Sequence, residues 1–192
     1  MAFLVYIMIC VILPNLIWQV NCKNRTSLSH AVWTFVFMIY IALALYVAEI
    51  GSFWDMISYK KLMGSINTEP FAPGGFKPDV LNIIMFMPLG FLLPLNWSSF
   101  RSLRKVAITG LGFSALIEFF QLFNYRITDV DDLIMNTIGA CVGYFIWTVF
   151  RRFVKNKRTI ERIKAEPVKL IMIGILGVCF FYNWRFVDAM SL

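Results

Sequence analysis

The sequence predicts an all-α membrane protein, a polytopic bundle of about six transmembrane helices. Three observations predict it. Of the 192 residues, 59% are hydrophobic and only 15% are charged, and the mean hydropathy of +0.71 lies far outside the soluble globular range. The hydrophobic residues form runs close to the roughly 20 residues that cross a bilayer. The basic residues mostly flank these runs, as topology signals do. We therefore expect a single membrane domain over residues 1–192.

The first two spans are expected at residues 2–20 and 31–50. A retained helix is favoured over a cleavable signal peptide for the first span, because no Lys or Arg precedes it and no small-residue cleavage site follows. Residues 51–77 then interleave aromatic, aliphatic and charged side chains. This composition favours a short amphipathic interfacial helix between spans 2 and 3.

The third span, expected at residues 80–95, is short and interrupted. Asn82 lies near its start, and Pro88 and Gly90 lie in its middle. Because Pro88 has no backbone N–H to donate to the preceding turn, we expect a kinked helix. Both a packing kink and a break that faces a ligand remain open.

The last three spans are expected at residues 106–123, 133–150 and 168–184. Between the final two, residues 151–169 hold eight Lys and Arg against two Glu, which predicts a cytoplasmic loop by the positive-inside rule. Alternation of the spans then places both termini outside the cell. In this orientation 13 of the 18 Lys and Arg residues lie on the cytoplasmic side, so the charge bias agrees with it.

Two neighbouring spans each carry polar residues at helical spacing, and we call these two sets the polar stripes. The first consists of Ser114, Glu118 and Gln121, which share one helix face. The second consists of Asp129, Asp132, Asn136, Gly139 and Gly143. A charged side chain facing lipid at mid-bilayer costs roughly 3 kcal/mol or more, so we expect the stripes to face each other.

Three further polar residues lie close to the stripes in the sequence. Arg126 falls in the turn between the two helices, Asp131 points off the second stripe, and Asn82 opens the third span. By the predicted orientation all three lie at the extracytoplasmic end of their spans. The sequence therefore predicts a polar site in the outer leaflet, and an ionisable residue inside a membrane indicates function by default.

The order and spacing of these residues resemble a known membrane family. The pattern runs Ser114-x3-Glu118-x2-Gln121, then Arg126-x2-Asp129-x2-Asp132-x3-Asn136-x2-Gly139-x3-Gly143. Upstream lie Asn67-x2-Pro70-Phe71 and Asp79-x2-Asn82-x5-Pro88-Leu89-Gly90-Phe91. Over about residues 67–147 the chain resembles the VanZ-like family, named for a teicoplanin-resistance membrane protein, although Thr68 and Glu69 stand where that family usually has apolar residues. The resemblance implies a role in low-level resistance to teicoplanin-type lipoglycopeptides or a related cell-envelope function.

Three functions remain open for this site. The first is recognition of a polar lipid headgroup or lipid-linked envelope precursor, with Arg126 contacting a phosphate or carboxylate. The second is an enzyme on a lipid-linked substrate, with Glu118 as general base and Asp129 and Asp132 holding a divalent ion. The absence of a Ser-His-Asp arrangement, a phosphate-binding glycine loop or a histidine cluster in the sequence argues against it. The third is a polar network that only holds helices together.

The predicted site is thus a set of candidate residues without an assigned reaction. The candidate ligand-binding residues are Asn82, Ser114, Glu118, Gln121, Arg126, Asp129, Asp132 and Asn136. The candidate structural residues are Pro88, Gly90, Gly139 and Gly143. We expect membrane lipids or a lipid-linked envelope precursor as partners, with no nucleic acid, no cofactor and no resident metal. The sequence leaves the oligomeric state open.

The cysteines and the single histidine are expected to be structural. Cys10, Cys22, Cys141 and Cys179 are scattered without metal-ligand spacing and are expected to be small buried hydrophobes. His30 precedes an apolar run and is expected at the start of a helix near the interface. One histidine excludes a multi-histidine zinc site.

Overall fold

The computed structural model describes residues 2–21, 28–50, 52–54, 57, 66–67, 76–122, 128–153 and 166–182. Within these ranges the chain is mostly helical, so the predicted all-α membrane bundle is confirmed. The helices are α1 (Ala2–Asn21), α2 (Leu28–Val47), α4 (Phe76–Asn96), α5 (Leu103–Gln121), α6 (Val130–Phe153) and α7 (Glu166–Phe181). A short 3-10 helix, η1 (Ser98–Phe100), follows α4, and two-residue strands β1 (Ile66–Asn67) and β2 (Thr128–Asp129) pair in parallel.

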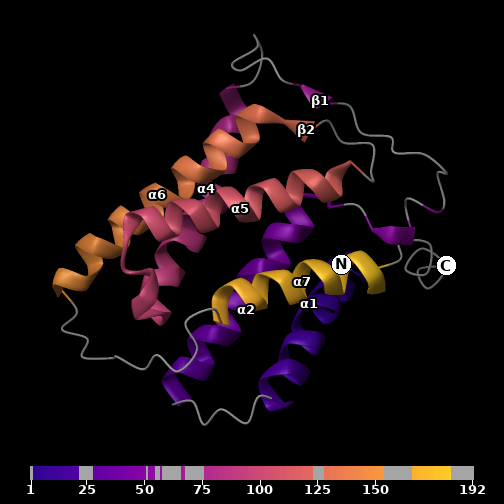
Figure 1. The fold of residues 1–192 in the computed structure, drawn as a ribbon, viewed down its shortest axis with the longest axis horizontal. Coiled ribbons are helices and arrows are strands. Elements are labelled where there is room, and N and C mark those ends of the chain that lie inside the picture. Colours follow the sequence, from indigo (N-terminus) through magenta and orange to yellow (C-terminus); the bar gives the residue numbers. More distant parts are fainter. Residues whose placement is uncertain are drawn as a thin grey trace.

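The helices form two groups of three, as Figure 1 shows. One group consists of α4, α5 and α6, and the other of α1, α2 and α7. Packing of α2 against α4 joins the two groups into one core. Apart from Asp129, which lies in β2, the residues of the polar stripes lie on α5 and α6, inside the first group.

Three of the described helices are long and apolar enough to cross a membrane, namely α1, α2 and α6. Helix α4 contributes a shorter apolar stretch, Val80–Asn96. The count of six spans therefore stays a prediction. Helix α2 ends at Val47, three residues before the expected end of span 2, and Glu49 follows with a positive φ of 51°. Most of the expected interfacial helix lies outside the described residues.

Helices α4 and α6 make the closest helix contact, and glycines permit it. A Cβ added at Gly139 or Gly143 would overlap the backbone of α4 at Ile83 or Met87. A Cβ at Gly90 would likewise overlap the carbonyl of Ala140 on α6. Gly139 lies against Ile83 and Gly143 against Met87, so residue numbers rise in the same direction and α4 and α6 run parallel. Helix α4 continues through both of its internal prolines, and its expected kink stays a prediction.

Helices α1 and α7 pack antiparallel in the second group. The hydroxyl of Tyr6 donates to the carbonyl of Phe181 at 2.8 Å, and further along α1 the fully buried Asn15 donates to the carbonyl of Leu170 at 3.3 Å. A Cβ at Gly177 would overlap the carbonyl of Cys10. Small residues and one buried amide thus hold α7 against α1, as in membrane helix pairs.

The ends of the helices lie at two opposite levels of the bundle. At one level Gln121 of α5 contacts Ala48 after α2, and Asn82 of α4 contacts Asp132 of α6. At the other level His30 of α2 contacts Glu166 of α7. We call these the cavity level and the basic level. Six of the seven Lys and Arg residues in the described ranges lie at the basic level: Arg101, Arg104, Lys105, Arg151, Arg152 and Lys169.

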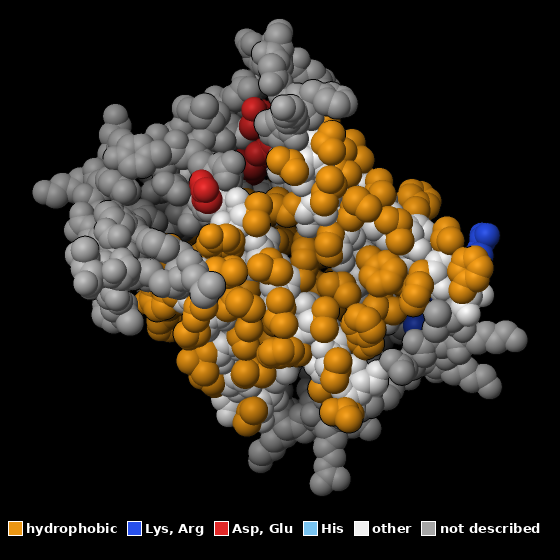
Figure 2. Space-filling model, turned by 180° about the vertical axis from the view of Figure 1, so that it is seen from behind, with side chains coloured by type: hydrophobic (Ala, Val, Ile, Leu, Met, Phe, Trp, Pro, Cys, Tyr) orange, Lys and Arg blue, Asp and Glu red, His pale blue; other side chains and the backbone are white. Residues whose placement is uncertain are grey.

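The surface between the two levels is apolar. In Figure 2 hydrophobic side chains cover the described surface of this face broadly, and the acidic side chains that are visible lie near its upper edge. Large hydrophobic residues such as Ile108, Phe145 and Phe180 are more than half exposed. A broad exposed apolar surface of this kind indicates contact with lipid.

The basic level contains a buried polar cluster that the sequence did not indicate. The Nε2 atom of His30 lies 3.0 Å from Oε2 of Glu166, and the indole of Trp97 donates to the same oxygen at 2.8 Å. His30 also meets the Trp97 ring edge to face. His30 does lie at the start of a helix, as expected, but it also links α2, α7 and the end of α4.

Candidate functional site

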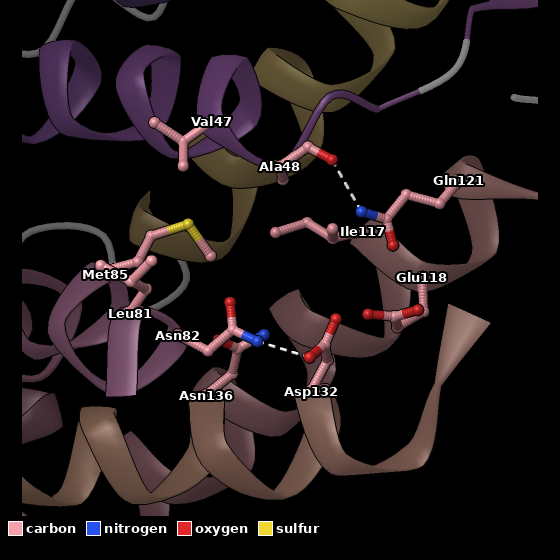
Figure 3. Close-up of a pocket in the computed structure, with 10 residues that line it drawn as sticks. All are labelled: Val47, Ala48, Leu81, Asn82, Met85, Ile117, Glu118, Gln121, Asp132 and Asn136. Atoms are coloured by element: carbon pink, nitrogen blue, oxygen red, sulfur yellow. Dashed lines mark hydrogen bonds between the residues drawn. The ribbon is translucent and has the colours of Figure 1, made fainter. Parts of the chain in front are cut away.

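A cavity of about 340 Å³ lies at the cavity level, between the ends of α2 and α5 and the starts of α4 and α6 (Figure 3). This volume falls in the range of roughly 300–1,000 Å³ that is typical of small-molecule sites. Its described lining residues are Val47, Ala48, Leu81, Asn82, Met85, Ile117, Glu118, Gln121, Asp132 and Asn136. Five are polar and five are apolar.

The polar wall joins α4, α5 and α6. The side-chain amide of Asn82 donates to the carboxyl of Asp132, and the backbone N–H of Asp129 donates to Oε2 of Glu118 at 3.2 Å. Glu118 is only 4% exposed. Figure 3 shows the carboxyl groups of Glu118 and Asp132 turned toward the same space. The two polar stripes therefore face each other, with Asn82 at the same level.

Two amide side chains reach deeper positions in the same wall. Nδ2 of Asn136 donates to the hydroxyl of Ser114 at 2.8 Å, and Nε2 of Gln121 donates to the carbonyl of Ala48 at 2.7 Å. Their side-chain oxygens are both buried without a hydrogen-bond partner. The hydrogen bonds of the amide nitrogens fix the two side chains, which line the cavity, and their oxygens stay buried without a donor. Buried polar groups in proteins are nearly always paired, so two such oxygens in side chains that line one cavity are unusual.

The opposite wall is apolar and open. Val47 at the end of α2 and Leu81 at the start of α4 are 58% and 64% exposed, and Met85 lies one turn below Leu81. The cavity therefore has a polar inner wall and an apolar rim on the lipid-facing surface. A site of this form can hold a polar group whose apolar remainder stays in the membrane.

The structure brings most of the predicted site residues together. Asn82, Glu118, Gln121, Asp132 and Asn136 line the cavity. Ser114, fully buried, lies beneath it as the partner of Asn136. Arg126 lies outside the described residues.

Asp129 differs from its expected place on the second stripe. It lies in β2, before α6 begins, and its Oδ1 accepts the backbone N–H of Asp131 at 3.0 Å. Asp129 therefore caps the start of α6, because a side-chain oxygen before the first helical residue satisfies a free backbone N–H there. The prediction from helical spacing counted Asp129 as part of the helix, whereas α6 begins one residue later, at Val130. Asp131 does lie off the stripe, but it is buried.

The carboxyl groups that the enzyme alternative would use for a divalent ion make different hydrogen bonds in the structure. Asp129 contacts the backbone of Asp131, and Asp132 contacts Asn82. Among the described residues no group of three or more His, Cys, Asp or Glu side chains could hold a metal ion.

Sequence reasoning missed the contribution of α2. Its end supplies Val47 to the rim and the Ala48 carbonyl that positions Gln121. Neither residue has a polar side chain that would indicate a site. The feature that indicates this contribution is the early end of α2 at Val47, because the carbonyls in the last turn of a helix lack partners within the helix.

Comparisons with known proteins identify the family of the chain. The sequence model of the VanZ/LLP1 family matches residues 1–151, which include all of α1, α2, α4 and α5 and nearly all of α6. Protein VanZ of Enterococcus faecium is 32% identical over 123 residues, which are 63% of this chain and 71% of that protein. No solved structure is significantly similar. Because the family match covers more than half of the chain, the protein belongs to the VanZ/LLP1 family and is a membrane protein of the VanZ, teicoplanin-resistance type.

Proposed function

We propose that the cavity recognises the polar headgroup of a membrane lipid or lipid-linked envelope precursor, and that this binding underlies a role in resistance to teicoplanin-type lipoglycopeptides. One observation carries the proposal: Gln121 and Asn136, whose side-chain oxygens are buried without a hydrogen-bond partner, line a cavity whose other wall is apolar and open. A network serving only to hold helices would leave neither the space nor the free acceptors.

The predicted orientation gives this site its biological setting. The basic residues of the described helices lie mostly at the level opposite the cavity, which supports placing the cavity in the outer leaflet. Envelope precursors and lipid headgroups are both accessible there. A bound headgroup would be held by Asn82, Glu118, Gln121, Asp132 and Asn136, while its acyl or prenyl chain would leave past Val47 and Leu81.

The test blocks the rim without touching the polar wall. Leu81→Trp places a large side chain at the opening, and Ile84→Trp is the matched control because Ile84 is exposed on the same helix and does not line the cavity. Cells carrying each variant are compared for teicoplanin susceptibility, and lipids retained after extraction into polymer nanodiscs are identified by mass spectrometry. We expect Leu81→Trp to lose protection and retained lipid, and Ile84→Trp to keep both. Unchanged lipid and protection in Leu81→Trp would refute the proposal.

A further inference from the structure

Two arginines from different elements lie over one tryptophan ring at the basic level. The guanidinium carbon of Arg151, in the last turn of α6, is 5.2 Å from the centre of the Trp147 ring, and that of Arg101, between η1 and α5, is 6.0 Å from it. Trp147 is only 3% exposed, whereas both arginines are exposed. A cation–π contact uses the face of the ring, so Arg151 is held in place and keeps N–H donors for a further partner.

The sequence of α6 explains why this contact forms. Tyr144, Trp147 and Arg151 are three and four residues apart, so they share the face of α6 that meets the turn before α5. The hydroxyl of Tyr144 donates to the carbonyl of Arg101 at 3.3 Å, which holds that turn against the helix. The end of α6 and the start of α5 are therefore fixed side by side.

Three more basic residues lie next to this contact. Arg104 and Lys105 are in the first turn of α5, and Arg152 follows Arg151 at the end of α6. All three are exposed. We call Arg101, Arg104, Lys105, Arg151 and Arg152 the basic junction.

The charges of the basic junction favour an anion. Arg104, Lys105, Arg151 and Arg152 make no ion pair with any acidic residue in the part of the chain that the structure describes. The start of a helix is the positive end of its dipole, so Arg104 and Lys105 lie where positive charge is unfavourable. Like charges gathered from two helices repel, and a bound anion reduces that repulsion.

An exposed apolar surface borders the basic junction. On α6 the side chains of Val149 and Phe153 are 53% and 81% exposed, and on α5 Ile108 is 59% exposed. In Figure 2 basic side chains lie at the right-hand edge of the molecule, beside the hydrophobic surface. A ligand that joins an anionic group to long apolar chains fits both surfaces, whereas a soluble anion would use only the charges.

We propose that the basic junction binds the phosphate of an anionic phospholipid from the leaflet at the basic level. The phosphate lies against the guanidinium groups held at Trp147, because a guanidinium can donate two parallel N–H bonds to one phosphate. The acyl chains lie along the apolar sides of α5 and α6. A zwitterionic phosphatidylcholine binds more weakly, because its quaternary ammonium would lie among the positive charges of Arg104, Lys105 and Arg152. This site lies at the opposite end of the bundle from the cavity and does not depend on the function proposed for the cavity.

The test uses the purified full chain, delipidated in detergent, with phosphatidylglycerol and phosphatidylcholine that carry the same acyl chains. Binding is measured by native mass spectrometry and by the shift in melting temperature. We expect phosphatidylglycerol to bind about tenfold more tightly than phosphatidylcholine, as a contribution from two basic residues would give. Equal binding of the two lipids would overturn the proposal.

Three variants with the same change of charge locate the site. Arg151→Gln should remove most of the preference for phosphatidylglycerol. Arg152→Gln, at the neighbouring position, and Lys169→Gln, whose side chain lies over the Trp18 ring at 5.8 Å, should keep the preference within about twofold. Equal weakening by all three variants would mean that only diffuse surface charge attracts the lipid, and it would overturn the site at Trp147.

Two controls cover folding and the source of the phosphate. Melting temperature without lipid shows whether Arg151→Gln is folded; if it is not, Arg101→Gln takes its place, and an unchanged preference in that variant refutes the site. The soluble probe is glycerol 3-phosphate, which has the anionic group without acyl chains. We expect it to bind far more weakly than phosphatidylglycerol, and equally tight binding would overturn the lipid as the ligand.

Discussion

The side-chain amide of Asn136 on α6 donates to the hydroxyl oxygen of Ser114 on α5, 2.8 Å away, and both side chains are almost wholly buried. This bond lies directly beneath the cavity and joins the two polar stripes. The side-chain oxygen of the same Asn136 is buried without a hydrogen-bond partner, and the residue lines the cavity. One residue therefore serves both the packing of the helices and the candidate site.

Removing the Ser114 hydroxyl should destabilise the bundle. In Ser114→Ala the Asn136 amide loses its partner inside the membrane, where such bonds contribute about 0.6–1.7 kcal/mol. We expect the melting temperature in detergent to fall by a few degrees, on the order of 2–4 °C per kcal/mol for a chain of this size. Gly112→Ala on the same helix is the control, because a Cβ there meets open space. If Ser114→Ala and Gly112→Ala have the same melting temperature, the hydrogen bond contributes nothing measurable to stability.

The glycines between α4 and α6 should not tolerate side chains. We expect Gly139→Leu and Gly143→Leu to lower the amount of folded protein severely, because each would place a Cβ within the backbone of α4. Gly112→Leu, facing open space, should accumulate normally. Fluorescence-detected size exclusion of the three variants makes the comparison. Normal amounts of the Gly139→Leu variant would show that α4 and α6 can move apart without loss of folded protein.

Asp132, in the polar wall of the cavity, and Arg126, which follows the first polar stripe in the sequence, should affect function more than folding. We predict that Asp132→Ala and Arg126→Ala give folded protein with the melting temperature of wild type but no protection in a teicoplanin-susceptibility assay, because water or lipid headgroups can fill the vacated space. Asn136→Leu, by contrast, should lower both stability and protection. Full protection by Asp132→Ala and Arg126→Ala would leave the stripes with a packing role alone.

The orientation can be tested by labelling. In a background without the native cysteines, a cysteine near Asn67 should react with an impermeant maleimide applied to intact cells, and one near Lys157 should react only after the cells are opened. The expectation follows from the 13 of 18 basic residues assigned to the cytoplasmic side. The reverse labelling pattern would place the cavity in the inner leaflet and remove its access to extracytoplasmic ligands.

The Glu166 contact should make stability depend on pH. Burial disfavours the charged form of Glu166, but the hydrogen bonds from His30 and Trp97 and the nearby His30 charge outweigh it and bring the pKa below its ordinary value of 4.5. A carboxyl whose pKa is lower in the folded state stabilises that state above the unfolded pKa, and this contribution is lost as the pH falls through the folded pKa.

Comparison with Glu166→Gln isolates this contribution, because glutamine keeps an acceptor for Trp97 and removes the charge. At about pH 5 we expect wild type to melt above the variant, and below the ordinary pKa of 4.5 we expect that interval to shrink. The measurement is melting temperature in detergent across this pH range. A constant interval down to the lowest pH would contradict the lowered pKa.

Much of the site followed from spacing alone. Polar residues three and four apart on apolar segments must share a helix face, and the high cost of exposing them to lipid forces those faces together. Glu118, Gln121, Asp132 and Asn136 were predicted on this basis and now lie around one cavity. The membrane class and the family resemblance followed from composition and motif order in the same way.

Tertiary structure alone decided the rest. Spacing could not show that Asp129 precedes α6, because a helix start depends on which backbone N–H groups find partners. It could not place the Ala48 carbonyl against Gln121, or Glu166 against His30, since these contacts join residues 73 and 136 positions apart. Nor could it reveal that two side chains lining the cavity keep buried amide oxygens without a partner. A helix face is encoded locally by its period, whereas the space between faces depends on how distant helices pack.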